Sequence, residues 1–510
     1  MAPYTIGVDI GTTGLKAVVL DLEQGVVAHA ERPHELLSSH PGWAEEDAEQ
    51  WWITTVSAIQ QLLNVVPASA IAAIGVSGMV PAMVLLDASG QPLRPSIQQN
   101  DARAGDEVEE LRASIDVEAF FRITGGVPNQ QNIAPRWRWL ARHEPDVIAR
   151  TAHLLGSYDF ISYCLTGEYN LEENWAAESG LYDILRRRWH MPYLEQAGIT
   201  ADQLPPVRRP TAVIGGVSDA AASATGLIAG TPVLAGSADH VAAALAAGLT
   251  TTGDVLLKFG GAGDILYCAE SPDPDKHFYF DYHDIPGLVL INGCMVSSGS
   301  LVKWFTRELA NSAQPEVLDA EAALIGPGAG GIVALPYFLG EKTPIFDPMA
   351  RGIFAGVMLH HTRAHLYRAV LESVCYGFAH HLALLREAGR PITRVLAADG
   401  GSRSAVWMQI AADVVGEPVS VVGGEAASAL GVAFVAAMGA GMATDWTDIR
   451  RYSPVGAIYQ PHTDAHAAYQ QGFALYRELY RQMQPLLPAL GTLEQAGTEL
   501  VATHKEAGVS

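Results

Sequence analysis

The chain has 510 residues, of which 49% are hydrophobic and 17% charged, a composition typical of a soluble globular protein with two or three domains. Its 32 basic and 55 acidic residues give a net charge of −23, which opposes binding to nucleic acid or to an anionic membrane surface. Anionic nucleotides are not excluded, because a few backbone amides lining a small site are enough to bind them.

The four cysteines lie far apart and show no metal-binding spacing, which favours reduced thiols. The N-terminus runs directly into an apolar strand without a basic leader, and no apolar run reaches the length of a membrane span. We therefore expect a soluble cytoplasmic protein that has no nucleic-acid partner and no membrane partner.

In chain order, three short apolar runs predict a meander of strands over 5–9, 15–20 and 26–31, the last two joined by a turn at 22–25. An amphipathic helix is predicted over 47–63, then strands over 71–76 and 83–86, and mainly helices through 103–155. Farther along, a strand within 231–236 precedes Ser237–His240 and an alanine-rich helix. Together these elements predict an α/β fold.

The turn between the first two strands has the chemistry of an anion site. Gly11 and Gly14 let backbone amides approach an anion, and Thr12 and Thr13 add hydroxyl donors. Asp9 ends the preceding strand, where its carboxylate could hold a divalent cation against the same anion. This combination suits the phosphates and magnesium of a nucleotide; the alternative is a glycine-rich hairpin at the edge of an α/β domain.

The same pattern begins again near residue 250. A strand over 254–259 is followed by a glycine turn at 260–263 and a returning strand over 264–268, which suggests two related halves facing each other across a cleft. A third turn, Asp399–Ser402, follows a strand at 395–398 and precedes a helix from about Ala405. Such a turn, at a strand end and a helix start, is where α/β sheets bind nucleotides.

Several longer patterns carry a family resemblance. They are Gly-Ser-Leu-Val-Lys-Trp-Phe at 299–305, Gly-Ile-Phe-Ala-Gly-Val at 352–357 with 365–372 after it, Asp399–Ser402 with Trp407 and Gln409, and the small-residue segment 425–431. Together with Asp9–Lys16, they resemble the FGGY family of carbohydrate kinases over nearly the whole chain. Pro336–Pro344 is similar to the xylulokinase branch rather than the glycerol kinase branch.

This resemblance implies two RNase H-like domains of the actin, hexokinase and heat-shock ATPase type around a central cleft. Residues 1–249 would form the N-terminal domain, with the sugar site and the catalytic aspartate. Residues 250–510 would form the ATP-binding domain, whose last helix is a candidate to pack back on the first. Closure of the two domains is expected to exclude water from the reaction.

The resemblance also implies roles for individual residues. Asp239 stands where the family keeps its general base; the alternative is that it only caps the alanine-rich helix. Asp9 would bind magnesium, or be an ordinary turn acid. Lys16 would neutralise phosphate charge, or point into solvent. Contacts to phosphate are expected from the following turn residues: Gly11, Thr12 and Thr13 in the first hairpin, Gly260 and Gly261 in the second, and Gly400, Gly401 and Ser402 in the third.

The expected sugar site departs from the relatives. Xylulokinases usually carry Gln-Met-His where this chain has Met79, Val80 and Pro81, and Trp-Asn-Asp-x-Arg where it has 99–103. Asp101 and Arg103 remain as hydroxyl partners, or pair with each other inside the domain. Asparagine or glutamine is commoner than His240 after the catalytic aspartate, so this imidazole contacts substrate or is structural. The apolar segment favours a deoxy- or modified pentulose, or a polyol, over D-xylulose.

A second departure concerns ATP. Relatives generally have Gly-Thr-Ser-Gly or Gly-Thr-Gly at 260–263, so Gly261 lacks a hydroxyl that would bind phosphate. Asp264 could join Asp9 at the metal, although a solvent-facing role is simpler. An ATP-dependent sugar kinase with magnesium is the leading interpretation. The alternatives are a catalytically weak sugar- or nucleotide-binding regulator and an ATPase that moves another protein. Homodimers are common among similar proteins, so a homodimer is a candidate assembly.

Overall fold

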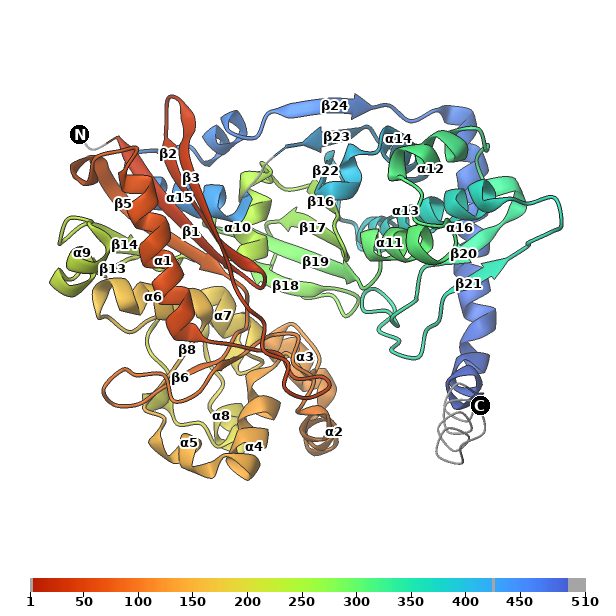
Figure 1. The fold of residues 1–510 in the computed structure, drawn as a ribbon. Coiled ribbons are helices and arrows are strands. Elements are labelled where there is room, and N and C mark those ends of the chain that lie inside the picture. The colour runs from red at the N-terminus through yellow and green to blue at the C-terminus, as the bar shows by residue number, and fades with distance from the viewer. Residues whose placement is uncertain (1–2, 424–426, 494–510) are drawn as a thin grey trace, which may run out of the picture. The chain divides into compact units, whose positions relative to one another are not determined.

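Runs of valine, isoleucine and leucine at the start of the chain form the central strands of a mixed sheet, because such side chains pack well on a pleated surface (Figure 1). The structure, a computed structural model, describes residues 3–423 and 427–493. The first sheet has the order β13 (Val213–Gly216), β14 (Pro232–Leu234), β5 (Ile71–Gly78), β1 (Tyr4–Gly11), β2 (Gly14–Asp21) and β3 (Gly25–Pro33), with β15 (Ser237–Ala238) also paired to β5.

The meander predicted at the N-terminus is confirmed. The predicted strands lie within β1, β2 and β3, and Gly25, the first residue of β3, has a φ of 85° that glycine adopts without strain. The predicted helix over 47–63 is α1 (Ala48–Leu63), and the carboxylate of Asp47 caps it by accepting a hydrogen bond from the amide of Glu49.

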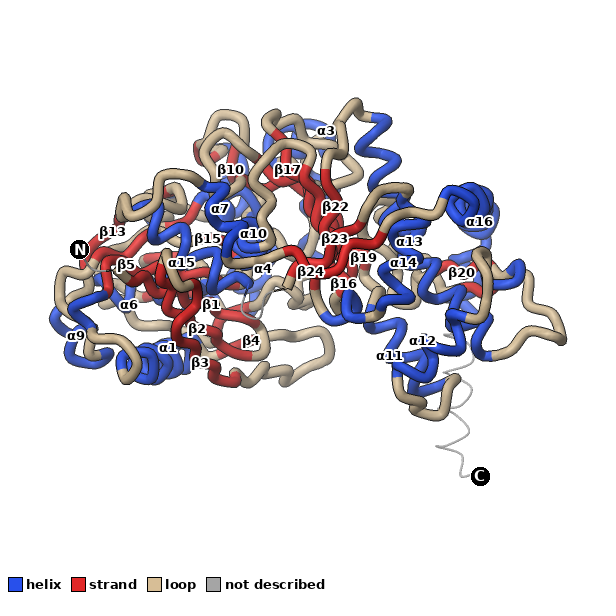
Figure 2. The backbone as a smooth tube through the Cα atoms, turned by 90° about the horizontal axis from the view of Figure 1, so that it is seen from above, coloured by secondary structure: helices blue, strands red, loops and turns tan. Residues whose placement is uncertain are grey.

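Helix α15 (Ala427–Gly439) covers β1 and β5 at very close range (Figure 2). A Cβ atom on Gly7 would lie 1.9 Å from the carbonyl oxygen of Ala429, so only glycine permits this approach. The hydroxyl of Thr5 donates to the carbonyl of Ala433 over 2.8 Å. The apolar face of the sheet is therefore sealed by a segment from far along the chain.

Shorter elements complete the part of the chain around this sheet. The helices are α2 (Gly105–Ser114), α3 (Val117–Thr124), α4 (Ile133–His143), α5 (Pro145–Arg150), α6 (Ser157–Thr166), α7 (Glu173–Glu178), α8 (Met191–Ala197), α9 (Asp219–Thr225), α10 (Asp239–Ala246) and the 3-10 turns η1 (Ala68–Ala70), η2 (Ala201–Gln203) and η5 (Trp446–Arg451). Two-stranded pairs join β4 (Glu45–Glu46) to β7 (Ser96–Ile97), β6 (Val84–Leu86) to β8 (His153–Leu155), β9 (Leu171–Glu172) to β12 (Val207–Arg208) and β10 (Tyr182–Asp183) to β11 (Arg188–Trp189).

The second large sheet repeats the pairing of the first. Its order is β18 (Tyr279–Tyr282), β19 (Val289–Met295), β17 (Gly263–Ala269), β16 (Asp254–Phe259), β22 (Arg394–Ala398), β23 (Val419–Val422) and β24 (Val455–Tyr459). β17 pairs antiparallel with β16, as β2 does with β1. β22 pairs parallel with β16, as β5 does with β1. The predicted repetition of strand, glycine turn and strand is confirmed.

Around this sheet lie α11 (Gly299–Glu308), α12 (Pro315–Ala323), α13 (Arg363–Glu387), α14 (Ala405–Val415), α16 (Thr463–Met483), the pair β20 (Val333–Leu335) and β21 (Ile353–Ala355), and the 3-10 turns η3 (Ala329–Gly331), η4 (Gly400–Arg403) and η6 (Gln484–Leu486). None of the helices in the described residues combines the length and apolar composition that a bilayer span requires.

The described chain divides into two compact units. The first comprises residues 3–252, 268–291 and 427–454, and the second comprises 253–267, 292–423 and 455–493. Residues 268–291 and 427–454 belong to the first unit although they follow residue 250 in the sequence. The units are therefore not two consecutive stretches of the chain. The last helix, α16, belongs to the second unit.

Candidate active site

A row of polar side chains crosses one face of the first sheet. Strand register places Ser237 opposite Ser77, Ser77 opposite Asp9, Asp9 opposite Lys16, and Lys16 opposite Glu31. Directly opposed residues share a face, and the hydroxyl of Ser77 donates to Oδ1 of Asp9 over 2.8 Å. Exposure rises along the row, from the buried serines to the exposed lysine and glutamate. The carboxylate of Asp9 thus lies at the border between core and solvent.

The phosphate-type hairpin follows Asp9 directly. Gly11 pairs with Gly14, which leaves Thr12 and Thr13 as the turn. A Cβ atom on Gly14 would lie 2.5 Å from the carbonyl oxygen of Arg32, so glycine is needed for β2 and β3 to meet there. Both threonines are at least partly exposed, and their hydroxyls are therefore accessible to an anion.

Lys16 is on the same face as Asp9, but its ammonium lies 3.9 Å from Oε1 of Glu31 on the next strand. Its side chain is 46% exposed, so this ion pair contributes about 0–1 kcal/mol to stability. The structure thus places Lys16 in solvent beside Glu31, and phosphate contact stays a prediction for it.

Asp239 is the first residue of α10, directly after β15. The N-cap is Ala238, which makes no side-chain cap hydrogen bond. The Asp239 carboxylate instead accepts, at Oδ1, the amide of His240 over 2.6 Å, and its side chain is 36% exposed. Asp239 is therefore not the N-cap that the alternative interpretation supposed, and its carboxylate is open to a ligand.

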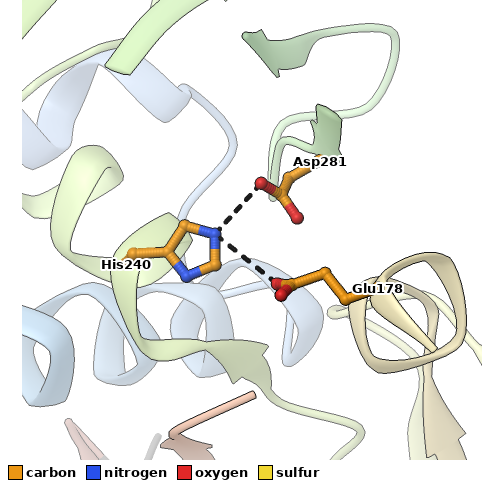
Figure 3. A group of neighbouring side chains, drawn as sticks. All are labelled: Glu178, His240 and Asp281. Carbon is orange, nitrogen blue, oxygen red and sulfur yellow. Dashed lines mark ion pairs between the residues drawn. The ribbon is translucent and has the colours of Figure 1, made fainter. Parts of the chain in front are cut away.

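The imidazole of His240 lies among acidic side chains (Figure 3). Its Nε2 is 3.1 Å from Oδ2 of Asp281 and 3.9 Å from Oε1 of Glu178, while Nδ1 is 3.3 Å from Oδ1 of Asp239. Burial alone would lower the pKa of His240, but the carboxylates of Asp281, Asp239 and Glu178 outweigh it and raise that pKa well above 6.5. Burial and Asp281 raise the pKa of Glu178 well above its usual range.

Nothing in the sequence predicted that Glu178 and Asp281 would lie next to His240. Asp281 is on β18 and Glu178 ends α7. The side-chain amide of Asn174 on α7 donates to the carbonyl of Tyr282 over 3.0 Å and accepts from the amide of Tyr282 over 2.7 Å. This double hydrogen bond fixes the strand against the helix and so brings the two acids to the imidazole.

The apolar segment predicted for the sugar site follows β5. The side chains of Met79 and Val80 are 1% and 6% exposed, and Pro81 is buried with them. Their backbone is fixed by polar neighbours: the hydroxyl of Ser157 donates to the Met79 carbonyl and the Arg136 guanidinium to the Pro81 carbonyl, each over 2.8 Å. The structure thus holds this segment rigidly and gives it an apolar character.

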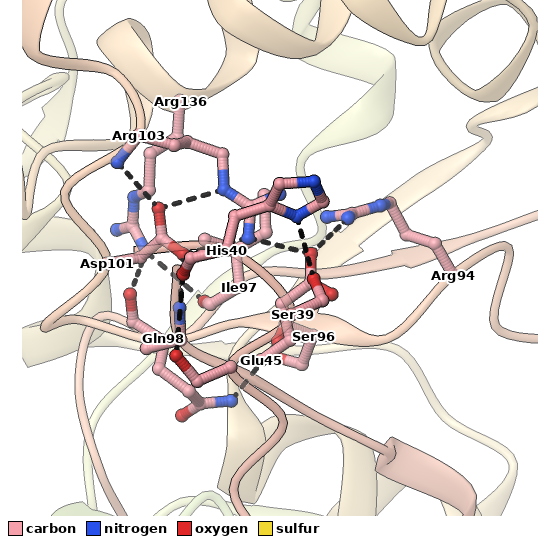
Figure 4. A network of polar contacts seen from close by, with 12 residues as sticks. Ser39, His40, Glu45, Arg94, Ser96, Ile97, Gln98, Asp101, Arg103 and Arg136 are labelled. Carbon is pink, nitrogen blue, oxygen red and sulfur yellow. Dashed lines mark hydrogen bonds and ion pairs between the residues drawn. The ribbon is translucent and has the colours of Figure 1, made fainter. Parts of the chain in front are cut away.

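Asp101 and Arg103 form a buried ion pair with each other (Figure 4). Nε and Nη2 of Arg103 donate to the two carboxylate oxygens over 2.8 Å each, and Nη2 also lies 2.7 Å from Oε1 of Glu45. The guanidinium stacks 3.8 Å above the ring of Trp43. Both paired side chains are fully buried. This arrangement matches the second interpretation of these residues, an ion pair within the domain rather than two contacts to the sugar.

In the second unit, the glycine turn after β16 is held by the start of α11. The carbonyl oxygens of Gly260 and Gly261 accept hydrogen bonds from the amides of Gly299 and Ser300 over 2.7 and 3.0 Å. A Cβ atom on Gly261 would meet no atom within 4 Å. There is therefore open space at Gly261, where a threonine was expected from the family resemblance.

A lysine that the sequence did not single out lies beside this turn. Lys258 faces Asp264 across the hairpin, with Nζ 3.6 Å from its carboxylate and 3.9 Å from that of Asp399. The antiparallel pairing of residues 254–259 with 263–269 could have predicted that Lys258 lies opposite Asp264. Asp264 thus forms an ion pair with Lys258 within the hairpin, and metal binding by Asp264 stays a prediction.

The third turn, Asp399–Ser402, forms η4 and leads into α14. Asp399 has a φ of 73°, a conformation that costs about 1–3 kcal/mol for a residue other than glycine. A Cβ atom on Gly401 would lie 2.6 Å from the ring of Trp407, so this glycine is fixed by packing. The hydroxyl of Ser402 donates to the carbonyl of Asp399 over 2.7 Å. Of the small-residue segment 425–431, Glu425 and Ala426 lie outside the described residues.

Two family models match this chain: the N-terminal domain of the FGGY family of carbohydrate kinases over residues 4–246 and the C-terminal domain of that family over residues 261–440. The chain belongs to the FGGY family of carbohydrate kinases. This FGGY kinase is 31% identical over 486 residues to the xylulose kinase of Escherichia coli K12, covering 94% of this chain and 99% of the relative. It is 30% identical over 494 residues to the L-xylulose/3-keto-L-gulonate kinase of the same strain, covering 95% and 98%.

Among solved structures, this FGGY kinase resembles the xylulose kinase of Rhodospirillum rubrum, with 44% identity, a TM-score of 0.92 and coverage of 95% and 99% of the two chains. The predicted fold, two α/β domains of the actin and hexokinase type, is confirmed. So is the predicted enzyme class: the protein is a sugar kinase that uses ATP, which disfavours the non-catalytic regulator.

Proposed function

We propose that this FGGY kinase phosphorylates a pentulose or a closely related keto sugar or polyol, with Asp239 as general base. The names of the two Escherichia coli relatives support a keto sugar of this class. One structural observation carries the assignment of the base: β1, β5 and β15 are parallel neighbours that end at the same edge of the sheet. That edge holds the Gly11–Gly14 hairpin and Asp239 together.

The spacing of these strands suits phosphoryl transfer. Adjacent strands lie about 4.8 Å apart, so the backbone of Asp239, two strands from β1, is roughly 10 Å from the hairpin. That gap accommodates a sugar hydroxyl and a phosphoryl group in line. The carboxylate of Asp239 takes the hydroxyl proton as the oxygen attacks, while Thr12, Thr13 and the hairpin amides neutralise the phosphoryl oxygens.

A magnesium ion fits the groups at Asp9. Magnesium prefers oxygen ligands, and the residues there offer a half-exposed carboxylate whose orientation is fixed by the Ser77 hydroxyl. Asp9 would hold the ion, directly or through water. When bound, the ion offsets the negative charge of the phosphates.

In the second unit, we assign the nucleotide phosphates to two turns: Gly260 and Gly261, and Gly400, Gly401 and Ser402. The open space at Gly261 leaves its backbone accessible to a phosphate oxygen. Lys258 lies beside the first turn and adds positive charge there.

The sugar is bound, in this proposal, against the rigid apolar segment Met79–Pro81 and next to His240. An apolar contact discriminates by only about 1–3 kcal/mol per methylene and does not reward a hydroxyl. We therefore expect 1-deoxy-D-xylulose or a polyol to be used at least as well as D-xylulose. A panel of ketoses, deoxyketoses and polyols, scored by kcat/KM, overturns this substrate choice if D-xylulose is preferred by a wide margin.

The general base is tested with Asp239→Asn in a sugar-stimulated ADP-release assay. We expect kcat to fall by about 10²–10⁴-fold, because the amide accepts no proton. Asp219→Asn is the matched control, since Asp219 is likewise the first residue of a helix, α9, and is exposed. An Asp239→Asn enzyme that keeps more than a tenth of the activity contradicts the proposal.

A further inference from the structure

The imidazole of His240 bridges two carboxylates. Nδ1 lies 3.3 Å from Oδ1 of Asp239 and Nε2 lies 3.1 Å from Oδ2 of Asp281. Carboxylate oxygens only accept hydrogen bonds, so both ring nitrogens must carry a proton for both contacts to form. The geometry therefore selects the imidazolium, a cation fixed from both sides.

Both hydrogen bonds that Asp239 accepts from His240 end on the same oxygen. The amide and the ring of His240 reach Oδ1, at 2.6 and 3.3 Å. An aspartate held at one oxygen has a fixed carboxylate plane and presents the other oxygen in a fixed direction. For a general base, that direction decides whether the acceptor hydroxyl is within reach of proton transfer.

We propose that His240, anchored by Asp281, is the positioning residue of Asp239: its imidazolium fixes Oδ1 and leaves Oδ2 to take the proton of the sugar hydroxyl. This inference rests on the proposed function of Asp239 and deepens it. It assigns a role to His240, which the sequence left either as a substrate contact or as a structural histidine, and to Asp281 on β18.

In the described part of the chain, the charged groups that face this imidazole are acidic. They are Asp239 on α10, Glu178 on α7, Asp281 on β18, and Asp284 in the loop after β18. Burial raises the pKa of Asp284 to about 7. Arg450, from η5, packs at the other end of α10, where it donates to the carbonyl of Gly248. Of these, Asp281, Asp239 and Glu178 raise the pKa of His240.

The proposal predicts a pH profile. The imidazolium is present at neutral pH and is lost as pH rises through the raised pKa of His240, so kcat/KM should fall on the alkaline side. In His240→Gln, the amide can still donate to Oδ1 but does not titrate. We expect its kcat to fall by about 10- to 100-fold through misalignment, and its alkaline limb to disappear.

Asp281→Asn is the sharper variant, because it leaves both Asp239 and His240 in place. A neutral amide stabilises the imidazolium less, so the alkaline limb should move to lower pH by about one unit or more. His277→Gln is the matched control: His277 is a partly exposed histidine paired with Asp275 over 2.9 Å, and its loss should leave the profile unchanged.

Thermal unfolding is measured for each variant. If Asp281→Asn does not fold, the His240→Gln profile decides alone. The proposal is overturned if His240→Gln keeps the wild-type kcat and alkaline limb, or if a folded Asp281→Asn enzyme keeps the limb at its wild-type pH. Failure of the proposed function looks different: Asp239→Asn would then remain active, or no sugar would stimulate ADP release from the wild type.

Discussion

Replacing Arg103 by alanine should destabilise the first unit strongly without acting on the sugar directly. The change removes the paired hydrogen bonds to Asp101, the contact with Glu45 and the stacking on Trp43. Breaking a buried pair from one side costs about 3–5 kcal/mol because the remaining charge is left without its partner. Asp101 keeps the amides of Ala44 and of residue 103 at 2.6 and 3.0 Å, so we expect the lower end, about 3 kcal/mol.

That loss is measured by urea unfolding, following the fluorescence of the tryptophans in the first unit. A decrease of about 3 kcal/mol changes the unfolding equilibrium by roughly two orders of magnitude. Arg103→Lys is the matched variant, since it keeps the charge but loses the paired donors, and it should fall between the wild type and Arg103→Ala. Arg451→Ala, which removes an exposed arginine of the same unit that pairs with Asp448 over 3.6 Å, should cost at most about 1 kcal/mol.

The reasoning is refuted if Arg103→Ala unfolds at the wild-type urea concentration. If that stable variant also showed a large rise in the KM for sugar, the ion pair would be secondary and Arg103 would contact the substrate. A destabilised variant whose remaining folded fraction has a normal KM supports the structural role.

Three further outcomes follow from individual positions. In Gly261→Thr the new side chain meets open space and adds a hydroxyl, so the KM for ATP should fall by about 2- to 10-fold. In Gly401→Ala the new methyl group would clash with Trp407, so the urea midpoint of the second unit should fall. Equal effects of the two substitutions on stability would contradict this difference in packing. Burial raises the pKa of Glu341 to about 8, so its stabilising contribution is complete below its unfolded pKa near 4.5 and is lost as pH rises towards 8. The unfolding free energy of Glu341→Gln minus that of the wild type should therefore be larger at pH 8.5 than at pH 5, because the wild type loses stability over this range, and a constant difference would argue against this. Gly7→Ala would place a methyl carbon 1.9 Å from the carbonyl oxygen of Ala429, and we expect an insoluble protein; normal soluble yield would show that α15 can move away.

Local pattern was enough to predict the parts of the site that are contiguous in sequence. The hairpin of Gly11–Gly14, the glycine turn after β16 and the helix start at Asp239 each follow from strand periodicity and turn residues over a few positions. The register between paired strands gives contacts that the residue pattern within one strand does not predict. It places Asp9 beside Ser77, and Lys258 beside Asp264.

Contacts between distant segments could not be predicted in this way. Asp281 and Glu178 meet His240 only because Asn174 fixes β18 to α7, and nothing in either segment signals the other. Asp101 and Arg103 are two residues apart, a spacing compatible with two partners for a sugar or with one ion pair. Burial decided between these arrangements in the structure, and burial is a property of the surrounding fold.

Helix α15 has a consequence for how the enzyme is made. The hydrogen bond between Thr5 and Ala433 spans 428 residues, and the helix that carries Ala433 covers the face of β1. During synthesis, the strand that leads into the Gly11–Gly14 hairpin leaves the ribosome first, yet its apolar face is covered only after most of the second unit has emerged. A product that stops before α15 contains Asp9, Asp239 and His240 but presents a bare sheet to the cell. We expect such a fragment to be bound by chaperones or degraded rather than to act as a partial kinase, because its apolar sheet face lacks the helix that covers it.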